Sequence, residues 1–237
     1  MKMLFIVNVS FMENLLFDYK RVKKGGIMKL EQRLKKRDLE RILSELEVNP
    51  SPKVEWEQYA SSSEVAASLL FIAAFTFNDI IGREVFDLGC GNGVLGIGAA
   101  LIGAKRVVGV DLDSRVLNVA RNNALKVGVS NLIDFVAMNV LDLTGSFDTV
   151  LQNPPFGVRR KSSDRIFLKK GIEIANVTYT IHKYGLKNRR FITQFVLENG
   201  GIVDRIIPMK MALPPTFPFH TKTKYVVEVD IYRILKN

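Results

Sequence analysis

Cysteine is almost absent from this chain: Cys90 is the only one among 237 residues. A disulfide within the chain and a zinc cluster built from cysteines are therefore excluded, and such usage is typical of a reducing compartment, here expected to be the cytoplasm. No apolar run reaches the roughly 18 residues that a membrane-spanning helix needs. Histidine is also scarce, with two residues. Neither His182 nor His220 lies in an acidic pattern, so we expect neither to act in acid–base catalysis.

Acidic residues are also in short supply. The chain has 34 Lys and Arg against 24 Asp and Glu, which gives a formal net charge of +10. An excess of this size favours a polyanionic partner, either nucleic acid or an anionic surface. With 237 residues, 47% of them hydrophobic, the chain is long enough for one large α/β domain and too short for two.

Residues 1–27 differ from the rest. They are mildly apolar, but polar residues interrupt them and no small-residue cleavage site follows, so they do not resemble a signal peptide. They end in Lys-Lys-Gly-Gly-Ile, and a purine-rich tract like a ribosome-binding site can encode the first four of these residues. We therefore expect translation to begin at Met28, leaving residues 28–237 as a single domain. The alternative is a flexible or interfacial N-terminal arm.

Two helices are expected within residues 29–80. Leucine and isoleucine at helical spacing predict the first over 29–48, and the prolines of "NPSP" at 49–52 end it. The second begins at the serines 61–63, with Glu64 in its first turn.

From Glu84 onward, short apolar runs alternate with helical segments. We expect strands within 84–89, 106–113, 132–139, 147–153 and 176–183, and helices over 94–103, 114–126, 164–175 and 187–198. Strand–helix alternation of this kind predicts a parallel, doubly wound sheet. Two long strands at the end of the chain, 201–213 and 224–235, are joined by a loop, so they should pair antiparallel.

A glycine-rich turn, "VFDLGCGNGVLGIG" (85–98), links the first of these strands to a helix. Gly89, Gly91 and Gly93 let the backbone turn sharply and approach a ligand closely. Asp111, at the end of the next strand, could accept hydrogen bonds from ribose hydroxyls. This predicts a nucleoside cofactor without identifying it, because "GNGVLG" also fits the weak dinucleotide pattern. The alternative is a strand–helix turn with no ligand.

Asp87 argues against a dinucleotide, because an acid at this place would repel the pyrophosphate. It favours S-adenosylmethionine, which carries an amino group and no phosphate. The array "DLGCGNG" resembles the first motif of the Rossmann-like S-adenosylmethionine-dependent methyltransferases. The resemblance implies that Asp87 helps to hold the methionine amine and that Asp111 binds the ribose. Asn139 stands where such enzymes contact the adenine amine, with Asp142 as a second choice, although either could be an ordinary loop cap. The other cofactor residues implied by the motif are Gly89, Asn92, Val94 and Val140.

A strand that ends in "QNPPF" has its exit path nearly fixed by two prolines. In this type of sheet the end of that strand faces the ligand. The side-chain oxygen of Asn153 and the carbonyl of Pro154 can accept the two hydrogens of a planar amine, and Phe156 can stack on its ring. Asn153-Pro154-Pro155-Phe156 resembles the catalytic motif of amino-group methyltransferases, which need no metal. A stiff turn with a packed Phe is the structural alternative.

The blocks "EWEQYASSSEVAASLL", "NPPFGVRRKSSDRIFL" and "FPFHTKTKYVVEVDIYRI" together resemble the archaeal and eukaryotic family that methylates adenine N6 in small-subunit ribosomal RNA. The similarity runs from about Leu30 to Ile234. It implies that Gln58 and Ser61 also contact the cofactor. Relatives often carry Thr in place of Ser61, and Asp in place of Asn139, so the chain departs from the family pattern at both positions.

Two basic segments, 157–165 and 217–224, are the expected RNA surface, because they combine cations with flexible or aromatic residues. Solvated charge is the alternative. The predicted contacts are Arg159, Arg160, Lys161, Phe219, His220, Lys222 and Lys224.

Residues 131–138 are expected to form an edge strand that is mostly apolar. Eukaryotic members of the resembling family pair with a small zinc-containing activator subunit, and such an edge could recruit it. Phe135 is the residue expected to contact this partner. The alternative is an edge covered by the N-terminal helix of the chain itself.

Two other functions compete with ribosomal RNA methylation. One is amide methylation of a protein glutamine, which uses a similar Asn-Pro-Pro step but would require a larger substrate domain than the roughly 50 residues available at the N-terminus. The other is an RNA scaffold that binds the cofactor without catalysis.

Overall fold

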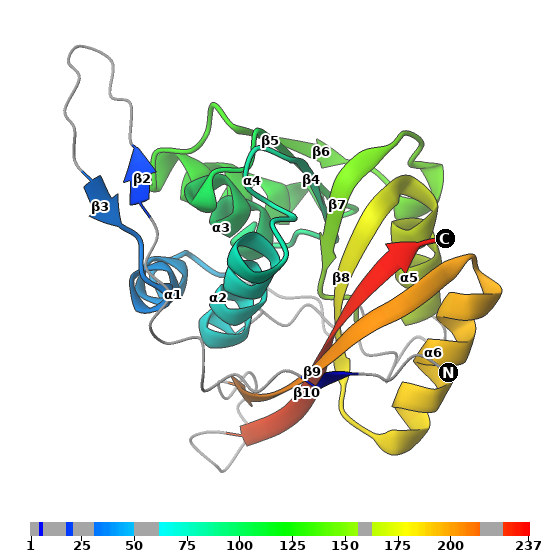
Figure 1. Ribbon diagram of the computed structural model, residues 1–237. Helices are drawn as coiled ribbons and strands as arrows, with labels where there is room; N and C mark the ends of the chain where they lie inside the picture. The colour runs from blue at the N-terminus through cyan, green and yellow to red at the C-terminus, as the bar shows by residue number, and fades with distance from the viewer. Residues whose placement is uncertain (1–4, 7–17, 21–30, 50–61, 156–162, 214–224) are drawn as a thin grey trace.

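The computed structural model describes residues 5–6, 18–20, 31–49, 62–155, 163–213 and 225–237. An eight-stranded sheet with the order β1-β9-β10-β8-β7-β4-β5-β6 runs through the molecule (Figure 1). Its strands are β1 (Phe5–Ile6), β4 (Glu84–Leu88), β5 (Arg106–Asp111), β6 (Ile133–Ala137), β7 (Phe147–Gln152), β8 (Ala175–Lys183), β9 (Gly201–Leu213) and β10 (Tyr225–Lys236).

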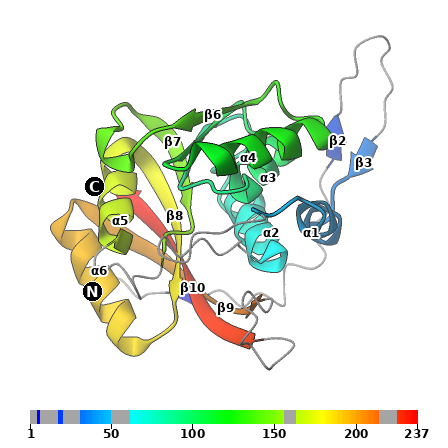
Figure 2. The same ribbon diagram turned by 180° about the vertical axis from the view of Figure 1, so that it is seen from behind.

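The helices divide into two groups on either side of the sheet, seen from the front in Figure 1 and from behind in Figure 2. The first group packs on one face and the second on the other. The first is α1 (Lys36–Ser44), α2 (Ser63–Phe71), α3 (Val94–Ile102) and α4 (Ser114–Lys126); the second is α5 (Ser163–Ile174) and α6 (Leu186–Glu198).

The predicted strand–helix alternation is confirmed. Strands β6, β5, β4, β7 and β8 are all parallel, and β10 pairs antiparallel with both β8 and β9. Alternate residues of one strand enter different cores: Val85 packs with the α1–α4 layer, whereas Phe86 packs with Phe147 on the opposite side. Because both faces are covered, these strands read as continuous apolar runs in the sequence.

The prediction of a helix over 29–48 was wrong in its first part. Residues Glu31–Arg33 form β3, which pairs antiparallel with β2 (Asp18–Lys20), and α1 begins only at Lys36. The Asp38 side chain accepts a hydrogen bond from the Lys35 backbone and marks this start. Strand pairing has overridden a helical pattern that is weak at its N-terminal end.

The second predicted helix begins where the serines placed it, with Ser62 at the N-cap, although the Ser62 side chain makes no capping hydrogen bond. After Phe71 the chain continues as a π-helical turn, η3 (Ile72–Thr76). The α2 helix is buried almost throughout, which explains why its apolar residues show no single face.

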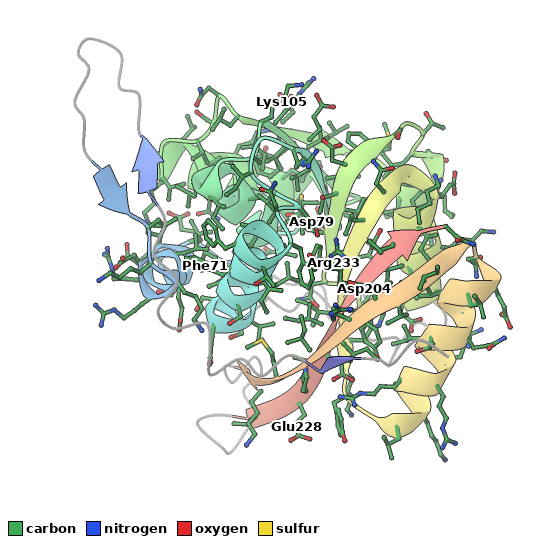
Figure 3. All side chains as sticks on the ribbon, viewed as in Figure 1. Phe71, Asp79, Lys105, Asp204, Glu228 and Arg233 are labelled. Atoms are coloured by element: carbon green, nitrogen blue, oxygen red, sulfur yellow. The ribbon has the colours of Figure 1, made fainter. Side chains whose placement is uncertain are left out.

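A polar cluster anchors the end of this helical layer to the antiparallel strands (Figure 3). Asp79 accepts hydrogen bonds from the Tyr179 hydroxyl (2.7 Å) and from Arg233 Nε (2.8 Å). Arg233 also donates to Asp204 (2.7 Å) and lies over the Phe77 ring. Because these charges are largely buried, removing one partner would leave another uncompensated.

The strand β6 forms one edge of the sheet, as predicted, and α1 packs against α2 and α3. Among the described residues, no strand pairs with the outer side of β6. The assignment of Phe135 as a partner contact was wrong. Phe135 is only 9% exposed and its ring lies against Gly93 and Gly109, while Val136 and Met138 are the exposed large apolar residues at this edge.

Two short parts of the segment 1–27 lie in strands. Phe5–Ile6 pairs parallel with Arg205 and Ile206 of β9, and β2 pairs with β3. The start of translation at Met28 stays a prediction. None of the described helices is both long and apolar enough to cross a membrane.

Candidate active site

Four residues singled out in the sequence follow or end four neighbouring parallel strands. Asp87 lies near the end of β4 and Asp111 at the end of β5, while Asn139 and Asn153 come just after β6 and β7. The strand order reverses between β4 and β7, since the chain goes from β4 outward to β6 and then returns to the other side of β4. Ligands bind at such a switch point in open α/β sheets.

The glycine loop turns the chain from β4 into α3. Gly89, Gly91 and Gly93 all have positive φ, at 68°, 53° and 86°. A methyl group on Gly89 would lie 2.7 Å from the Phe167 ring of α5. Both this close contact and the positive φ therefore disfavour any side chain at position 89. A methyl group on Gly91 would meet nothing within 4 Å, so the loop is open at its centre.

Asp87 is fully buried beneath the loop, where its Oδ2 accepts a hydrogen bond of 2.7 Å from the Gly96 backbone. Burial raises the pKa of Asp87 to about 7, and the nearby Asp111 carboxylate contributes in the same direction. Burial likewise raises the pKa of Asp111. The two acids therefore stand close together at a cost in free energy, and a cation bound between the strand ends would offset this cost.

Asp111 fixes the backbone around it. Its Oδ2 accepts from Gly91 N–H (3.0 Å) and its Oδ1 from Asp113 N–H (2.9 Å). Each carboxylate oxygen has a second lone pair that could accept a ribose hydroxyl. Asp113, which the sequence reading did not single out, caps α4 through the Arg115 backbone and holds the Arg115 guanidinium with both oxygens.

These observations test which cofactor the residues fit. A dinucleotide would bring its pyrophosphate to a loop backed by two acids, whereas S-adenosylmethionine brings a sulfonium and an ammonium group. Among the described residues, no basic side chain is an ion-pair partner of Asp87 or Asp111. The acidic pair and the open glycine loop therefore fit S-adenosylmethionine.

The loop after β6 carries the third predicted contact. Asn139 is exposed, and its Oδ1 accepts from Leu141 N–H at 3.0 Å, so it caps the 3₁₀ turn η4 (Val140–Asp142). Asn139 is therefore a loop cap, which was the alternative to an adenine contact. The cap uses only the side-chain oxygen, so the side-chain NH₂ can still donate to a ligand. Val140 is buried, and Asp142 is exposed.

Asn123 is a residue that the sequence reading missed. It is fully buried in α4, and its Nδ2 donates to the Asn92 carbonyl of the glycine loop (3.0 Å) and to the Glu47 carbonyl (2.9 Å). Its Oδ1 accepts from Glu47 N–H (2.9 Å), and the Asn92 side chain also donates to the Glu47 carbonyl (3.0 Å). An asparagine among the apolar residues of a helix is the signal that could have revealed this bridge.

The proline step ends β7 as expected. Asn153 and Pro155 are half-buried and Pro154 is buried, next to Gln152, which is the last residue of the strand. Strand β7 lies between β4, with the glycine loop at its end, and β8. The Asn-Pro-Pro step and the two acids therefore come together at one edge of the sheet.

His182 is buried, and burial lowers the pKa of its ring to about 4. Its Nε2 lies 2.9 Å from the Thr180 hydroxyl. The absence of an acid–base role stays a prediction. Several predicted contacts lie outside the described residues. They are Gln58, Ser61, Phe156, Arg159, Arg160, Lys161, Phe219, His220, Lys222 and Lys224.

This sheet order and this arrangement of acids, glycines and Asn-Pro-Pro define a Rossmann-like class I methyltransferase. Residues 60–175 match the methyltransferase small domain family. The rRNA N6-adenosine-methyltransferase of Drosophila melanogaster is 35% identical over 208 residues, covering 85% of this chain and 96% of that protein. An uncharacterized protein of Methanocaldococcus jannaschii is 38% identical over 215 residues, covering 86% and 95%.

The crystal structure of a candidate RNA methyltransferase from Pyrococcus horikoshii matches with a TM-score of 0.79 and 38% identity, covering 86% of this chain and 98% of that one. The chain therefore belongs to the family of the rRNA N6-adenosine methyltransferases.

Proposed function

We propose that this protein transfers a methyl group from S-adenosylmethionine to the N6 amine of an adenosine in small-subunit ribosomal RNA. The observation that carries the proposal is the position of Asn153-Pro154-Pro155 at the end of β7, beside the strand that leads into the acidic glycine loop. Membership of the family supports the activity and the RNA substrate. The choice of small-subunit RNA depends on the resemblance described above.

The chain itself supplies binding and orientation. When bound, S-adenosylmethionine provides an electrophilic methyl group on its sulfonium. Asp87 would hold the methionine amine of the cofactor, and Asp111 would accept hydrogen bonds from its ribose. The buried ring of Pro154 fixes the position of the Pro154 carbonyl. The Asn153 oxygen and the Pro154 carbonyl then accept the two amine hydrogens, which favours a pyramidal nitrogen with its lone pair directed outward. Alignment of this kind can lower the barrier by roughly 7–11 kcal/mol.

A direct test combines purified protein, labelled S-adenosylmethionine and small-subunit ribosomal RNA from cells that lack the gene, followed by mass spectrometry of the nucleosides. We expect one N6-methyladenosine that is absent without the protein. A parallel reaction replaces the RNA with the protein fraction of the same cells: methylation of a protein glutamine there, with no change in the RNA, would instead support the amide alternative. Cofactor binding with no transfer to either would support the scaffold alternative.

Two further parts of the proposal concern partners and compartment. Val136 of the outer strand β6 and Met138 just after it are 36% and 37% exposed, which supports an apolar docking surface there. That its occupant is a small zinc-containing subunit is proposed from the family resemblance alone. The substitution Val136→Glu should abolish co-purification of that subunit. If the protein purified alone is monomeric and fully active, an obligate partner is contradicted.

A cytoplasmic location is proposed from cysteine usage alone.

A further inference from the structure

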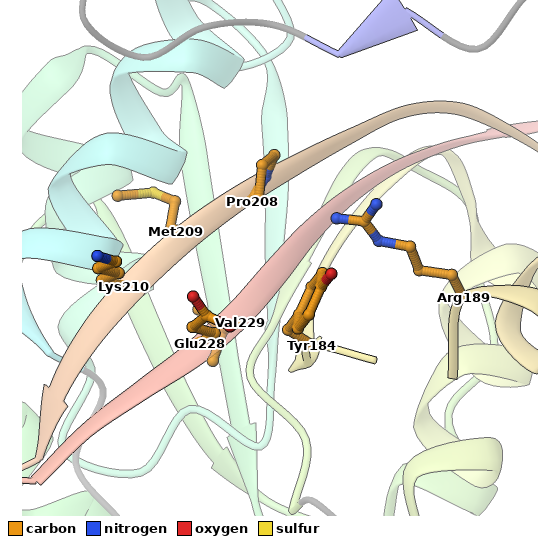
Figure 4. Close-up of a pocket in the computed structure, with 7 residues that line it drawn as sticks. All are labelled: Tyr184, Arg189, Pro208, Met209, Lys210, Glu228 and Val229. Carbon is orange, nitrogen blue, oxygen red and sulfur yellow. The ribbon is translucent and has the colours of Figure 1, made fainter. Parts of the chain in front are cut away.

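An open hollow lies between the start of α6 and the β9–β10 hairpin, and the function proposed above does not use it (Figure 4). Its volume is about 370 Å³, which is within the range of small-ligand sites. Tyr184 and Arg189 form one side of it, and Lys210 and Glu228 come from the hairpin.

The aromatic side of the hollow is supported by a buried ion pair. Arg189 donates to both oxygens of Asp230, at 2.8 and 2.7 Å, and Asp230 is fully buried in β10. The Arg189 guanidinium lies 4.9 Å from the centre of the Tyr184 ring. Tyr184 is nevertheless 39% exposed.

The segments that border the hollow carry several exposed cations. Lys183, Lys187 and Arg190 lie on these segments outside the lining, whereas Lys210 lines the hollow opposite Glu228 on the neighbouring strand. An exposed ring held by a guanidinium and surrounded by cations suits a nucleobase with its phosphates. The Glu228 carboxylate could accept a hydrogen bond from an exocyclic amine.

The hollow lies on the same edge of the sheet as the Asn-Pro-Pro step. Thr180 of β8 pairs with Gln152 of β7, and the Tyr184 N–H continues the ladder by donating to the Glu228 carbonyl. Strand geometry then places the backbone of Tyr184 roughly 10 Å from that of Asn153. A nucleotide close to the methylated adenosine along an extended strand can span this separation.

We propose that this hollow binds an unpaired nucleotide of the RNA substrate that flanks the methylated adenosine, with its base stacked on Tyr184. The proposal rests on the proposed function for the identity of the RNA. Arg189 and Asp230 fix the ring in place, so that little side-chain freedom is lost when a base stacks on it. The cations contact phosphates, which are present whatever the sequence.

The test measures RNA binding and methyl transfer for Tyr184→Ala, Tyr184→Leu and Tyr184→Phe, with Phe191→Ala as the matched control. Phe191 is 38% exposed and also lies against an arginine, Arg165, but it does not line the hollow. Stacking on one aromatic residue is worth about 1–3 kcal/mol, so Tyr184→Ala and Tyr184→Leu should weaken single-stranded RNA binding by roughly 5- to 150-fold. Tyr184→Phe should retain wild-type affinity.

Three further readings separate stacking from other effects. The slope of affinity against salt concentration should not change in the Tyr184 variants, because no phosphate contact is lost. S-adenosylmethionine affinity and the thermal midpoint of Tyr184→Leu should equal those of wild type. Equal RNA affinities for Tyr184→Leu and Phe191→Ala would overturn the proposal. Loss of RNA affinity in the Tyr184 variants of a protein that methylates no RNA would refute the proposed function and leave the base-stacking site standing.

Discussion

Replacing Asn123 by alanine should weaken both the fold and the cofactor site, because its side chain joins the backbone of Asn92 in the glycine loop to that of Glu47. The side chain makes three hydrogen bonds, one with the Asn92 carbonyl and two with the Glu47 backbone. A net value of about 0.5–1.5 kcal/mol for each predicts a loss of about 3 kcal/mol in the free energy of unfolding. This is a large part of the 5–15 kcal/mol typical of a domain.

The effect on the cofactor follows from the Asn92 carbonyl. Without the Asn123 amide, part of the glycine loop must be ordered when S-adenosylmethionine binds, at a cost comparable to one hydrogen bond. We therefore expect cofactor affinity to fall roughly 2- to 10-fold. Asn123→Asp should be worse than Asn123→Ala, because it directs a carboxylate oxygen at two carbonyls.

Urea unfolding gives the first quantity and calorimetric titration with S-adenosylmethionine gives the second. Asn122→Ala is the matched control, because Asn122 is the adjacent residue of α4 and is exposed. It should change the free energy of unfolding by less than about 0.5 kcal/mol. The reasoning is refuted if the two alanine variants have the same urea midpoint and the same cofactor affinity.

Other substitutions separate the roles within the site. Asn153→Ala should reduce methyl transfer by roughly a hundredfold or more and leave cofactor affinity within a few-fold. Equal losses of cofactor binding and turnover in this variant would contradict the role of Asn153. Asp111→Ala should instead weaken cofactor binding first. The pKa of Asp87, raised from 3.8 to about 7, means that the unfolded state binds fewer protons between these values. The contribution of Asp87 to stability therefore falls as pH rises from about 4 to about 7, and Asp87→Asn should remove this slope in urea titrations. The contribution of His182 to stability changes with pH in the opposite direction, because the pKa of its ring is lowered from 6.5 to about 4. This contribution is complete above pH 6.5 and is lost as pH falls toward 4. A wild-type acid sensitivity retained in His182→Gln would contradict this assignment.

The fold from β4 onward could be predicted from the sequence, because the central strands β4 and β7 are largely buried and appear as short apolar runs that alternate with helical segments. The same periodicity placed Asp87, Asp111 and Asn153 at neighbouring strand ends, since topology alone brings these ends together. Contacts between distant segments could not be predicted in this way. Asn123 bonds to Glu47 across 76 positions, and Arg233 bonds to Asp79 across 154. No local pattern encodes such a pairing.

The error over Phe135 shows how side-chain direction can reverse the interpretation of an apolar strand. Residues 131–138 read as an exposed edge, yet Ile133 and Phe135 point inward, and the large apolar residues exposed there are Val136 and Met138. The inward position of Phe135 depends on a missing side chain. A methyl group on Gly109 would lie 2.8 Å from the Phe135 ring, so the glycine in β5 makes room for the aromatic ring in β6.

The glycine loop is consequently supported from three elements that are distant in the sequence. Phe167 of α5 packs on Gly89, Phe135 of β6 packs on Gly93, and Asn123 of α4 holds the Asn92 carbonyl. Asp111 adds a fourth contact through the Gly91 N–H. Because each contact is made by the protein alone, we expect the loop to keep its conformation without cofactor. Slow hydrogen exchange at the Gly91 amide in cofactor-free protein would agree with this, and exchange at the rate of an open loop would contradict it.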